Sequence, residues 1–277
     1  MRWYEAVFLG ILQGLSEFLP ISSSAHLALA QEYLGIETNM SSRLGFEVLL
    51  HLATLLAVVF VYRDDVLNLV KGTLTLGFKI ISLKIFKNGM TFYERLALCT
   101  GISTLLLIPA AIFDGFLATL SSSVTAIGIC LMINSIILWF SDVLGRQSKD
   151  LSKISPENAL MAGLCQLLAL LPGISRSGST VTGMLWQDFD RESAVKYSFI
   201  MSVPTILGAS VLELDTLWAA NRSQEELCVY ALGALCAVLT AILAMKLLTY
   251  ISKKSNFRTF SYYCFALGVL VIVTKTL

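Results

Sequence analysis

Six long apolar stretches limit the folds open to this chain of 277 residues more than any other feature. Each has roughly the 20 residues that an α-helix needs to cross the ~30 Å hydrocarbon layer of a bilayer. They cover residues 45–62, 94–113, 122–142, 191–213, 227–249 and 258–275. Hydrophobic residues make up 56% of the chain and charged residues 14%, which lies outside the usual composition of soluble domains. The sequence therefore predicts an all-α integral membrane protein.

Net charge and cysteine spacing do not indicate a nucleic-acid-binding, disulfide-rich or zinc-binding protein. The formal net charge of +1 gives no indication of a nucleic-acid partner. The six cysteines lie in apolar segments without CxxC spacing, so we interpret them as buried thiols. Neither a disulfide framework nor a zinc site is expected.

Residues 13–26 form a polar segment within this apolar sequence: Gln-Gly-Leu-Ser-Glu-Phe-Leu-Pro-Ile-Ser-Ser-Ser-Ala-His. Pro20 lacks a backbone donor and ends a helix predicted over 3–19. The serines at 22–24 predict the N-terminal cap of a second helix over 24–34. The second helix is too short to cross a bilayer. The pair is therefore expected to form a re-entrant hairpin that returns to the face it came from.

The polar side chains of this hairpin have helical spacings. Gln13 and Glu17 are four residues apart and share one face of the first helix. Ser23 and His26 are three apart and share one side of the second. A carboxylate and an imidazole are costly inside a membrane and usually mark a functional site.

A second copy of this pattern lies 153 residues downstream, at Pro-Gly-Ile-Ser-Arg-Ser-Gly-Ser-Thr in residues 172–180. An ungapped alignment pairs Ala6 with Ala159, Gly10 with Gly163, Gln13 with Gln166, Ile21 with Ile174, Ser22 with Ser175, Ser24 with Ser177 and Phe46 with Phe199, and it pairs Ser23 with Arg176. Small and hydroxylated residues can also serve only to pack membrane helices closely. The charged groups Glu17, His26 and Arg176 favour a functional interpretation.

The apolar stretches and hairpins together predict a topology. Residues 66–87 carry Lys71, Lys79, Lys84 and Lys87, which favours an interfacial amphipathic helix over a seventh span. Each half then holds one hairpin and three spans, so the second hairpin enters from the opposite face and the halves form an inverted-topology repeat. We expect one membrane domain over 1–277, with repeat 1 at 1–142, an interfacial insert at about 63–93, and repeat 2 at 154–277. The broken tips are expected to meet near the midplane.

Lysines and arginines support this topology through the positive-inside rule. The loops of one face hold thirteen: Arg63, Lys71, Lys79, Lys84, Lys87, Arg95, Arg146, Lys149, Lys153, Arg191, Lys253, Lys254 and Arg258. The other face, with both termini, holds four: Arg2, Arg43, Arg222 and Lys275. The first face is therefore predicted to be cytoplasmic and both termini to be outside. The hairpin with Glu17 enters from outside, and the hairpin with Arg176 from the cytoplasm.

Paired hairpin tips of this kind suit a phosphate. Two helix N-termini supply backbone donors and partial positive charge, and the Arg176 guanidinium matches phosphate oxygens. The hydroxyls of Ser175, Ser177, Ser179 and Thr180 can complete the site. A phosphate site inside a membrane implies a substrate with an apolar tail. Ser23 and His26 can act as nucleophile and base, while Glu17 can orient the imidazole, take a proton or hold a divalent cation.

Residues 17–26 and 172–180 resemble the two signature motifs of the bacterial undecaprenyl-diphosphatases of the bacitracin-resistance type. The resemblance covers essentially the whole chain. It implies a multi-pass protein of the bacterial inner (plasma) membrane that removes the terminal phosphate from undecaprenyl diphosphate. The product, undecaprenyl phosphate, is reused in envelope polysaccharide synthesis. The resemblance also implies assistance by Mg²⁺ or Ca²⁺ and an inverted repeat with two re-entrant hairpins.

Roles for individual residues follow from the same resemblance. Ser23 is expected to be the nucleophile or a phosphate contact, and His26 its catalytic partner. Glu17 is expected to be an acidic catalytic or metal residue. The diphosphate-binding set is then Arg176, Ser175, Ser177, Thr180, Ser22 and Gln13.

Three positions depart from the usual family motif. Gln13 stands where many members have glutamate, so the second carboxylate of a two-carboxylate metal site is absent here, although the amide of Gln13 can still donate an oxygen. Ala25 replaces the usual glycine before the histidine, and Ser179 replaces an alanine. The first of these two narrows backbone freedom at the tip, and the second adds a hydrogen-bond donor.

The sequence leaves several alternatives open. Ser23 can attack with His26 as base, His26 can attack phosphorus directly, or Glu17 and a metal can activate water. Glu47 and His51, four residues apart, can extend the pocket, although His51 alone is more simply a buried core histidine. A transporter or flippase of polyprenyl phosphate lipids is the competing class, because inverted repeats with broken helices are also transporter architecture. Metal identity, prenyl chain length and the oligomeric state, including a homo-oligomer, are undetermined.

Overall fold

The computed structural model describes residues 1–36, 40–83, 89–109, 114–141, 143, 148–213, 223–254 and 256–276, and these form helices without any β-strand. The elements are α1 (Trp3–Phe18), α2 (Ser23–Leu34), α3 (Met40–Val61), α4 (Arg63–Ile81), α6 (Phe92–Leu105), α7 (Asp114–Ser121), α8 (Val124–Ser141), the 3₁₀ helix η2 (Leu151–Lys153), α9 (Pro156–Leu168), α10 (Arg176–Leu185), α11 (Arg191–Leu212), α13 (Gln224–Lys254) and α14 (Arg258–Thr276). The prediction of an all-α protein is confirmed for these residues.

Four of the predicted spans coincide with helices that are long and apolar enough to cross a membrane, namely α3, α8, α11 and α13. The chain is therefore a multi-pass membrane protein. The predicted span 94–113 begins with α6, which ends at Leu105, and its last residues, 110–113, lie outside the described residues. The predicted span 258–275 corresponds to α14.

Other sequence predictions also fall partly outside the described residues. Lys84 and Lys87 of the interfacial segment do so, as do Arg146 and Arg222 of the charge comparison and the side chain of Arg43.

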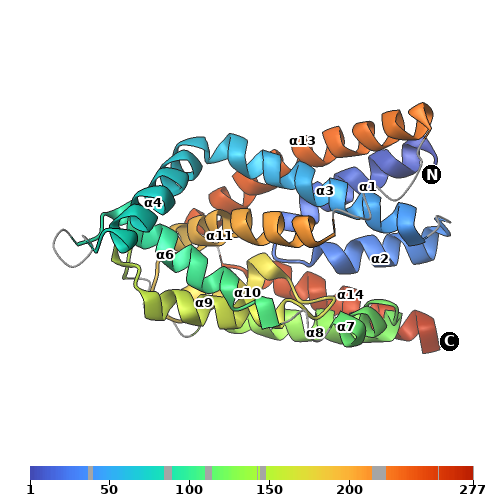
Figure 1. Ribbon diagram of the computed structural model, residues 1–277. Coiled ribbons are helices and arrows are strands. Elements are labelled where there is room, and N and C mark those ends of the chain that lie inside the picture. Colours follow the sequence, from blue (N-terminus) through green and yellow to red (C-terminus); the bar gives the residue numbers. More distant parts are fainter. Residues whose placement is uncertain are drawn as a thin grey trace.

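The segment predicted as an interfacial helix is α4, at the end of the bundle opposite both termini (Figure 1). Lys79 of this helix pairs with Glu94 of α6 at 2.7 Å and so ties the two helices together. One face of α4 leaves large apolar side chains exposed, among them Leu67, Val70, Leu74 and Phe78. These positions recur at helical spacing, as expected for a face that meets lipid.

Both predicted helix breaks are present. α1 ends at Phe18, before Pro20, and α2 begins at Ser23. Ser22 caps α2 by accepting a hydrogen bond from the backbone N–H of Ala25 at 3.5 Å. In the second pair, α9 ends at Leu168, and Ser175 caps α10 by accepting from the Gly178 N–H at 3.1 Å. The cap serines therefore satisfy backbone donors that a helix start leaves free.

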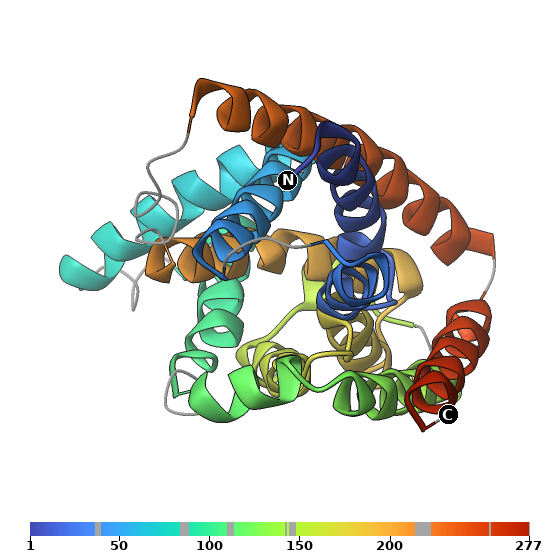
Figure 2. The same ribbon diagram turned by 90° about the vertical axis from the view of Figure 1, so that its right-hand side faces the viewer.

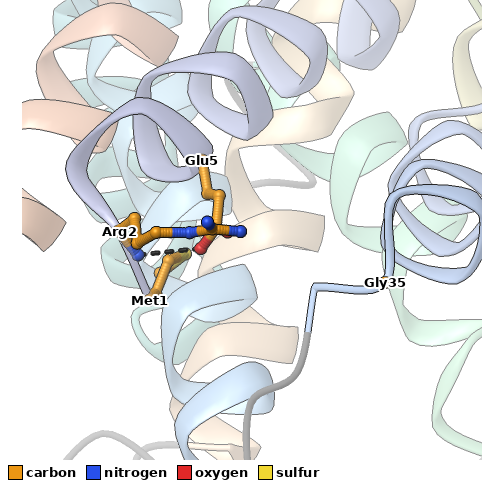
Figure 3. A pocket seen from close by; sticks show the side chains of 4 residues that line it. All are labelled: Met1, Arg2, Glu5 and Gly35. Carbon is orange, nitrogen blue, oxygen red and sulfur yellow. Dashed lines mark hydrogen bonds and ion pairs between the residues drawn. The ribbon is translucent and has the colours of Figure 1, made fainter.

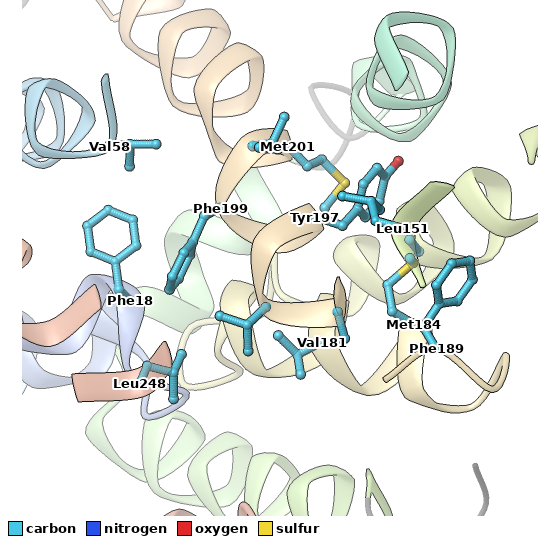
Figure 4. Packing of buried hydrophobic residues seen from close by; sticks show 14 of the residues in the cluster. Phe18, Val58, Leu151, Val181, Met184, Phe189, Tyr197, Phe199, Met201 and Leu248 are labelled. Carbon is cyan, nitrogen blue, oxygen red and sulfur yellow. The ribbon is translucent and has the colours of Figure 1, made fainter. Parts of the chain in front are cut away.

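Viewed along the bundle, the first hairpin lies inside a ring of longer helices (Figure 2). α13, in orange, runs along one side, and α8 and α14, in green and red, run along the other. Beside the hairpin, the Phe18 ring packs edge-on against Phe199 of α11, with ring centroids 5.3 Å apart (Figure 4). Both rings belong to one buried apolar cluster, which holds the end of α1 in place next to the polar residues of the helix break.

Close packing between α1 and α13 depends on glycine. A Cβ added at Gly10 would lie 2.1 Å from the backbone O of Gly233, so any side chain there forces the helices apart. We expect Gly10→Ala to destabilise the folded protein by about 1–3 kcal/mol, the usual cost of overpacking. Thermal unfolding in detergent measures this. Gly101→Ala on α6 is the control, because a Cβ there meets no atom within 4 Å, and it should leave the midpoint unchanged or raised. An unchanged midpoint for Gly10→Ala would contradict the prediction.

Candidate functional site

The two helix breaks contact each other directly. Ser177 Oγ, in the first turn of α10, donates to the backbone O of Leu19 at 3.3 Å. A Cβ at Gly178 would lie 3.2 Å from the Pro20 Cβ, so the glycine lets the start of α10 approach the first break closely. The predicted contact between the two tips is therefore present, and this hydrogen bond joins a side chain and a backbone oxygen that are 158 positions apart in the sequence.

An ion pair joins the tips at their polar side. Arg176 Nη2 lies 2.6 Å from Glu17 Oε1, and both side chains are largely buried, at 15% and 6% exposure. The second carboxylate oxygen, Oε2, accepts hydrogen bonds from Ser23 Oγ at 2.8 Å and from Gln13 Nε2 at 3.0 Å. Glu17 thus gathers a guanidinium, a hydroxyl and an amide around one carboxylate. In the repeat alignment Arg176 occupies the position of Ser23. The guanidinium and the hydroxyl therefore come from equivalent positions of the two tips, and both contact the carboxylate of Glu17.

Two atoms of this cluster are buried and have no hydrogen-bond partner among the described residues: Arg176 Nη1 and Gln13 Oε1. A buried donor or acceptor without a partner costs on the order of 1–3 kcal/mol. The unpartnered guanidinium nitrogen can bind an anion, and the unpartnered amide oxygen can bind a cation or a donor.

A cavity of about 260 Å³ opens beside the cluster and is lined by both hairpins. Five of the predicted site residues line it: Glu17, Ser22, Ser23, Ser175 and Arg176. Apolar residues also line it, among them Leu107, Ala169, Leu170, Ile206 and Ala209. The cavity therefore presents charged and hydroxyl groups together with apolar side chains to the same ligand.

Three further predicted residues lie behind this lining. Gln13 is fully buried, and its Nε2 lies 3.0 Å from Glu17 Oε2 and 3.3 Å from His51 Nδ1, both on residues of the cavity lining. Ser177 does not line the cavity, but its Oγ lies 3.0 Å from the Oγ of Ser175, which does. The hydroxyl of Thr180 is directed to Ser198 of α11 at 2.7 Å. These side chains support the site rather than line it.

His26 has other partners than those predicted. Its Nδ1 donates to the backbone O of Ser22 at 2.7 Å, and its Nε2 lies 2.7 Å from the hydroxyl of Tyr263 on α14. The two rings stack, with centroids 5.7 Å apart. Ser23 donates to Glu17 instead of pairing with the imidazole. A catalytic role for His26 stays a prediction, and it requires a change of partners.

His51 lies on the cavity wall, although the sequence favoured a core position for it. Its Nδ1 donates to the backbone O of Glu47, one turn earlier, at 2.9 Å. Its Nε2 lies 3.8 Å from Glu17 Oε2. The four-residue spacing of Glu47 and His51 was the available signal that this face of α3 is polar.

Gln166 and Thr205 also line the cavity and were not predicted as site residues. Thr205 Oγ1 donates to Gln166 Oε1 at 3.2 Å, and Gln166 Nε2 donates to the backbone O of Ser103 at 3.3 Å. The alignment of Gln166 with Gln13 in the repeat was the signal that could have identified the glutamine.

The expected Mg²⁺ or Ca²⁺ can be tested against this donor set. Within the described residues no group of three or more histidine, cysteine, aspartate or glutamate side chains could hold a metal. Glu17 and the free Oε1 of Gln13 are adjacent oxygen donors. Mg²⁺ is commonly held by one or two carboxylates together with substrate phosphates. The residues therefore fit a cation that is shared with a bound phosphate.

A second, shallower pocket lies at the N-terminus and is lined by Met1, Arg2, Glu5 and Gly35 (Figure 3). Arg2 Nε donates to Glu5 Oε1 at 2.6 Å, and the Arg2 backbone N–H donates to Glu5 Oε2 at 2.8 Å. These groups satisfy each other at the start of α1, so the pocket offers no comparable chemistry.

The fold and the site define a multi-pass helical membrane protein with a buried polar centre, built around Glu17 and Arg176, between two broken helix pairs. The chain matches the Bacitracin resistance protein BacA family over residues 6–270 and belongs to this family. It is 38% identical over 274 residues to the undecaprenyl-diphosphatase of Halothermothrix orenii, covering 99% of this chain and 98% of the relative. It is 35% identical over 281 residues to the undecaprenyl-diphosphatase of Alkaliphilus metalliredigens, covering 100% of both.

Proposed function

We propose that this protein hydrolyses undecaprenyl diphosphate to undecaprenyl phosphate and inorganic phosphate, and so recycles the lipid carrier of cell-wall polysaccharide synthesis. The observation that carries the proposal is the unpartnered Nη1 of Arg176 beside the bonded pair of Ser23 and Glu17. A guanidinium binds phosphate oxygens through parallel N–H donors, and the hydroxyl supplies a nucleophile next to a carboxylate. The names of the relatives agree with this activity.

The cavity suits the head group and excludes most of the lipid tail. Its volume of about 260 Å³ is too small for a long prenyl chain, which must continue outside it. The apolar lining residues, among them Leu107, Leu170 and Ile206, can contact the first part of that chain while the charged lining residues hold the diphosphate. A buried apolar contact and a buried charge contact then orient the substrate in one direction.

Ser23 is the nucleophile in the mechanism that the geometry supports best. Its Oγ attacks the terminal phosphorus, a new O–P bond forms, and the bond from that phosphorus to the bridging oxygen breaks, which releases undecaprenyl phosphate. The Oγ proton passes to Glu17 Oε2, 2.8 Å away. Water then hydrolyses the phosphoserine, which releases inorganic phosphate and restores the hydroxyl.

Arg176 holds the reacting groups together for this step. Its Nη2 lies 2.6 Å from Glu17 Oε1, while its Nη1 has no partner among the described residues and is free to bind a phosphate oxygen. Attack by His26 and attack by water are the alternative steps, which the Ser23 variants discussed below distinguish.

We also propose an inverted-topology repeat with six spans, two re-entrant hairpins and both termini outside the bacterial plasma membrane. The helices of the first hairpin, α1 and α2, are about 24 and 18 Å long at 1.5 Å per residue, shorter than the ~30 Å hydrocarbon layer. Both termini lie at one end of the bundle, whereas α4 lies at the other (Figure 1). The lysine and arginine distribution supports a cytoplasmic location for the α4 end.

A divalent cation is expected to act with the substrate, held by Glu17, Gln13 Oε1 and phosphate oxygens. When bound, it neutralises charge on the diphosphate during attack. Gln13→Glu adds a carboxylate to this set and should lower the Mg²⁺ concentration for half-maximal activity by about tenfold, equivalent to roughly 1.4 kcal/mol of binding. Gln13→Leu, which removes the oxygen, should raise it. Equal cation requirements in the three proteins would contradict this assignment.

Release of inorganic phosphate from undecaprenyl diphosphate tests the proposed activity. The purified protein is assayed in detergent with Mg²⁺, with Ca²⁺ and with EDTA. Cation-dependent release supports the proposal. If well-folded protein releases no phosphate under any of these conditions, hydrolysis is excluded, and lipid transport across vesicles becomes the activity to measure.

A further inference from the structure

Asn134 is a fully buried amide in the middle of α8, inside one of the candidate membrane spans. Burying an amide in apolar surroundings is unfavourable unless it is hydrogen-bonded. The chain could use any apolar side chain at this position of the helix, so the contacts of the amide have to explain its presence. It does not line the cavity.

The amide bonds both hairpin tips at once. Its Nδ2 donates to the backbone O of Pro20 at 3.1 Å, in the first break. Its Oδ1 accepts from the backbone N–H of Ser175 at 3.0 Å, in the second break. Both are backbone groups that interrupted helices leave outside their own hydrogen-bond ladders. Among the side chains that the structure describes, Asn134 is therefore a direct polar link between the two interruptions.

The helix that carries this amide is held firmly. α8 packs against α14 at Gly128, where an added Cβ would lie 3.1 Å from the backbone O of Gly268. Cys264 of α14 reinforces the same contact, because its Sγ accepts from Asn134 Nδ2 at 3.3 Å. Neither Gly128 nor Cys264 touches the cavity. The amide thus projects from a rigid pair of helices.

We propose that Asn134 is a positioning residue that sets the two hairpin tips against each other for catalysis. Pro20 lies three residues after Glu17, and Ser175 directly precedes Arg176. Fixing these two backbone atoms fixes the separation of the carboxylate and the guanidinium, which meet at 2.6 Å. The inference rests on the proposed phosphatase activity and adds a residue outside the signature motifs.

Two substitutions separate positioning from simple packing. Asn134→Leu keeps a similar volume but removes both bonds. Asn134→Asp keeps an acceptor for Ser175, and its carboxyl can donate to Pro20 only while it is protonated. The Asp variant therefore has both links at acid pH and loses one at alkaline pH. Ser141→Ala is the matched control on α8, because the Ser141 hydroxyl is buried but donates only to Leu138 of its own helix.

The test compares kcat/KM for phosphate release across pH 5–9, each value divided by that of the wild type at the same pH. Asn134→Leu should lose about 10²-fold at every pH, as expected for a displacement of catalytic groups by about 1 Å. Asn134→Asp should stay within about threefold of wild type at pH 5 and fall toward the Leu variant as pH rises. Ser141→Ala should stay near wild type throughout. Cys264, which contacts the side chain at position 134, is unchanged in all the proteins.

Several outcomes would overturn the proposal. One is a Leu variant with near wild-type activity, and another is an Asp variant whose relative activity does not change with pH. If the Leu variant does not fold, the Asp variant alone decides, since a single folded sample is taken reversibly between the two pH values. Absence of phosphate release by the wild type would instead refute the proposed function, which keeps the two failures distinct.

Discussion

Arg176→Ala is expected to lower kcat/KM for phosphate release by about 10³-fold or more, the scale seen when an arginine that stabilises a phosphoryl-transfer transition state is removed. The guanidinium contacts Glu17 through Nη2 and leaves Nη1 free for the substrate. Arg176→Lys keeps the positive charge but not the planar pair of donors, so it should recover only part of this loss. Phosphate release at saturating and limiting substrate measures both variants.

Folding has to be separated from catalysis in this experiment. Removing Arg176 leaves Glu17 as a buried charge without its ion-pair partner, which typically destabilises a protein by about 3–5 kcal/mol. The double variant Glu17→Gln with Arg176→Ala removes that charge and should recover thermal stability while staying inactive. Arg95→Ala is the arginine control, since Arg95 Nη2 donates to the backbone O of Ser152, away from the cavity. An Arg176→Ala protein with more than a tenth of wild-type activity would refute the proposal that Arg176 binds the phosphate in the transition state.

Local signals explain why the broken helices could be predicted. Pro20 cannot continue the hydrogen-bond ladder of α1, and Ser22 and Ser175 are residue types that cap helix starts. Both effects act within a few residues, so they are visible in the sequence. The direct contact between the tips was predictable only through the repeat, because Ser177 and Leu19 are otherwise distant in the chain.

The choice of side-chain partners could not be predicted in the same way. Ser23 and His26 share one side of α2, and this spacing suggested that they pair. In the structure Ser23 turns to Glu17 of α1, while His26 meets Tyr263 of α14. Spacing along one helix does not show which neighbouring helix packs on each face. The same limitation hid the position of His51 on the cavity wall.

The hydropathy pattern also could not predict where a helix ends inside an apolar stretch. The stretch 94–113 is apolar enough to suggest one span, but α6 ends at Leu105. Pro109 lies four residues further on and has no N–H to donate to the backbone O of Leu105, so the α-helical hydrogen-bond pattern cannot continue there. A count of apolar residues does not include this conformational effect, which explains why composition overestimated the helix.

Ser23→Ala is expected to lower phosphate release by about 10³-fold or more if Ser23 is the nucleophile, since nothing else in the same position can form the covalent intermediate. His26→Gln should then lose much less, because its ring nitrogens bond Ser22 and Tyr263 instead of Ser23. Purified protein and isotopically labelled substrate, quenched in acid within the first turnovers, should yield phosphoserine at Ser23. Ser24→Ala is the matched hydroxyl control, with its Oγ 3.2 Å from Ser22 Oγ, and should lose less than Ser23→Ala.

The alternative mechanisms predict different results in this set of variants. Direct attack by His26 predicts an acid-labile phosphohistidine and a larger loss for His26→Gln than for Ser23→Ala. Attack by water predicts no covalent phosphoenzyme and a modest loss for Ser23→Ala, because the hydroxyl then only binds phosphate oxygens.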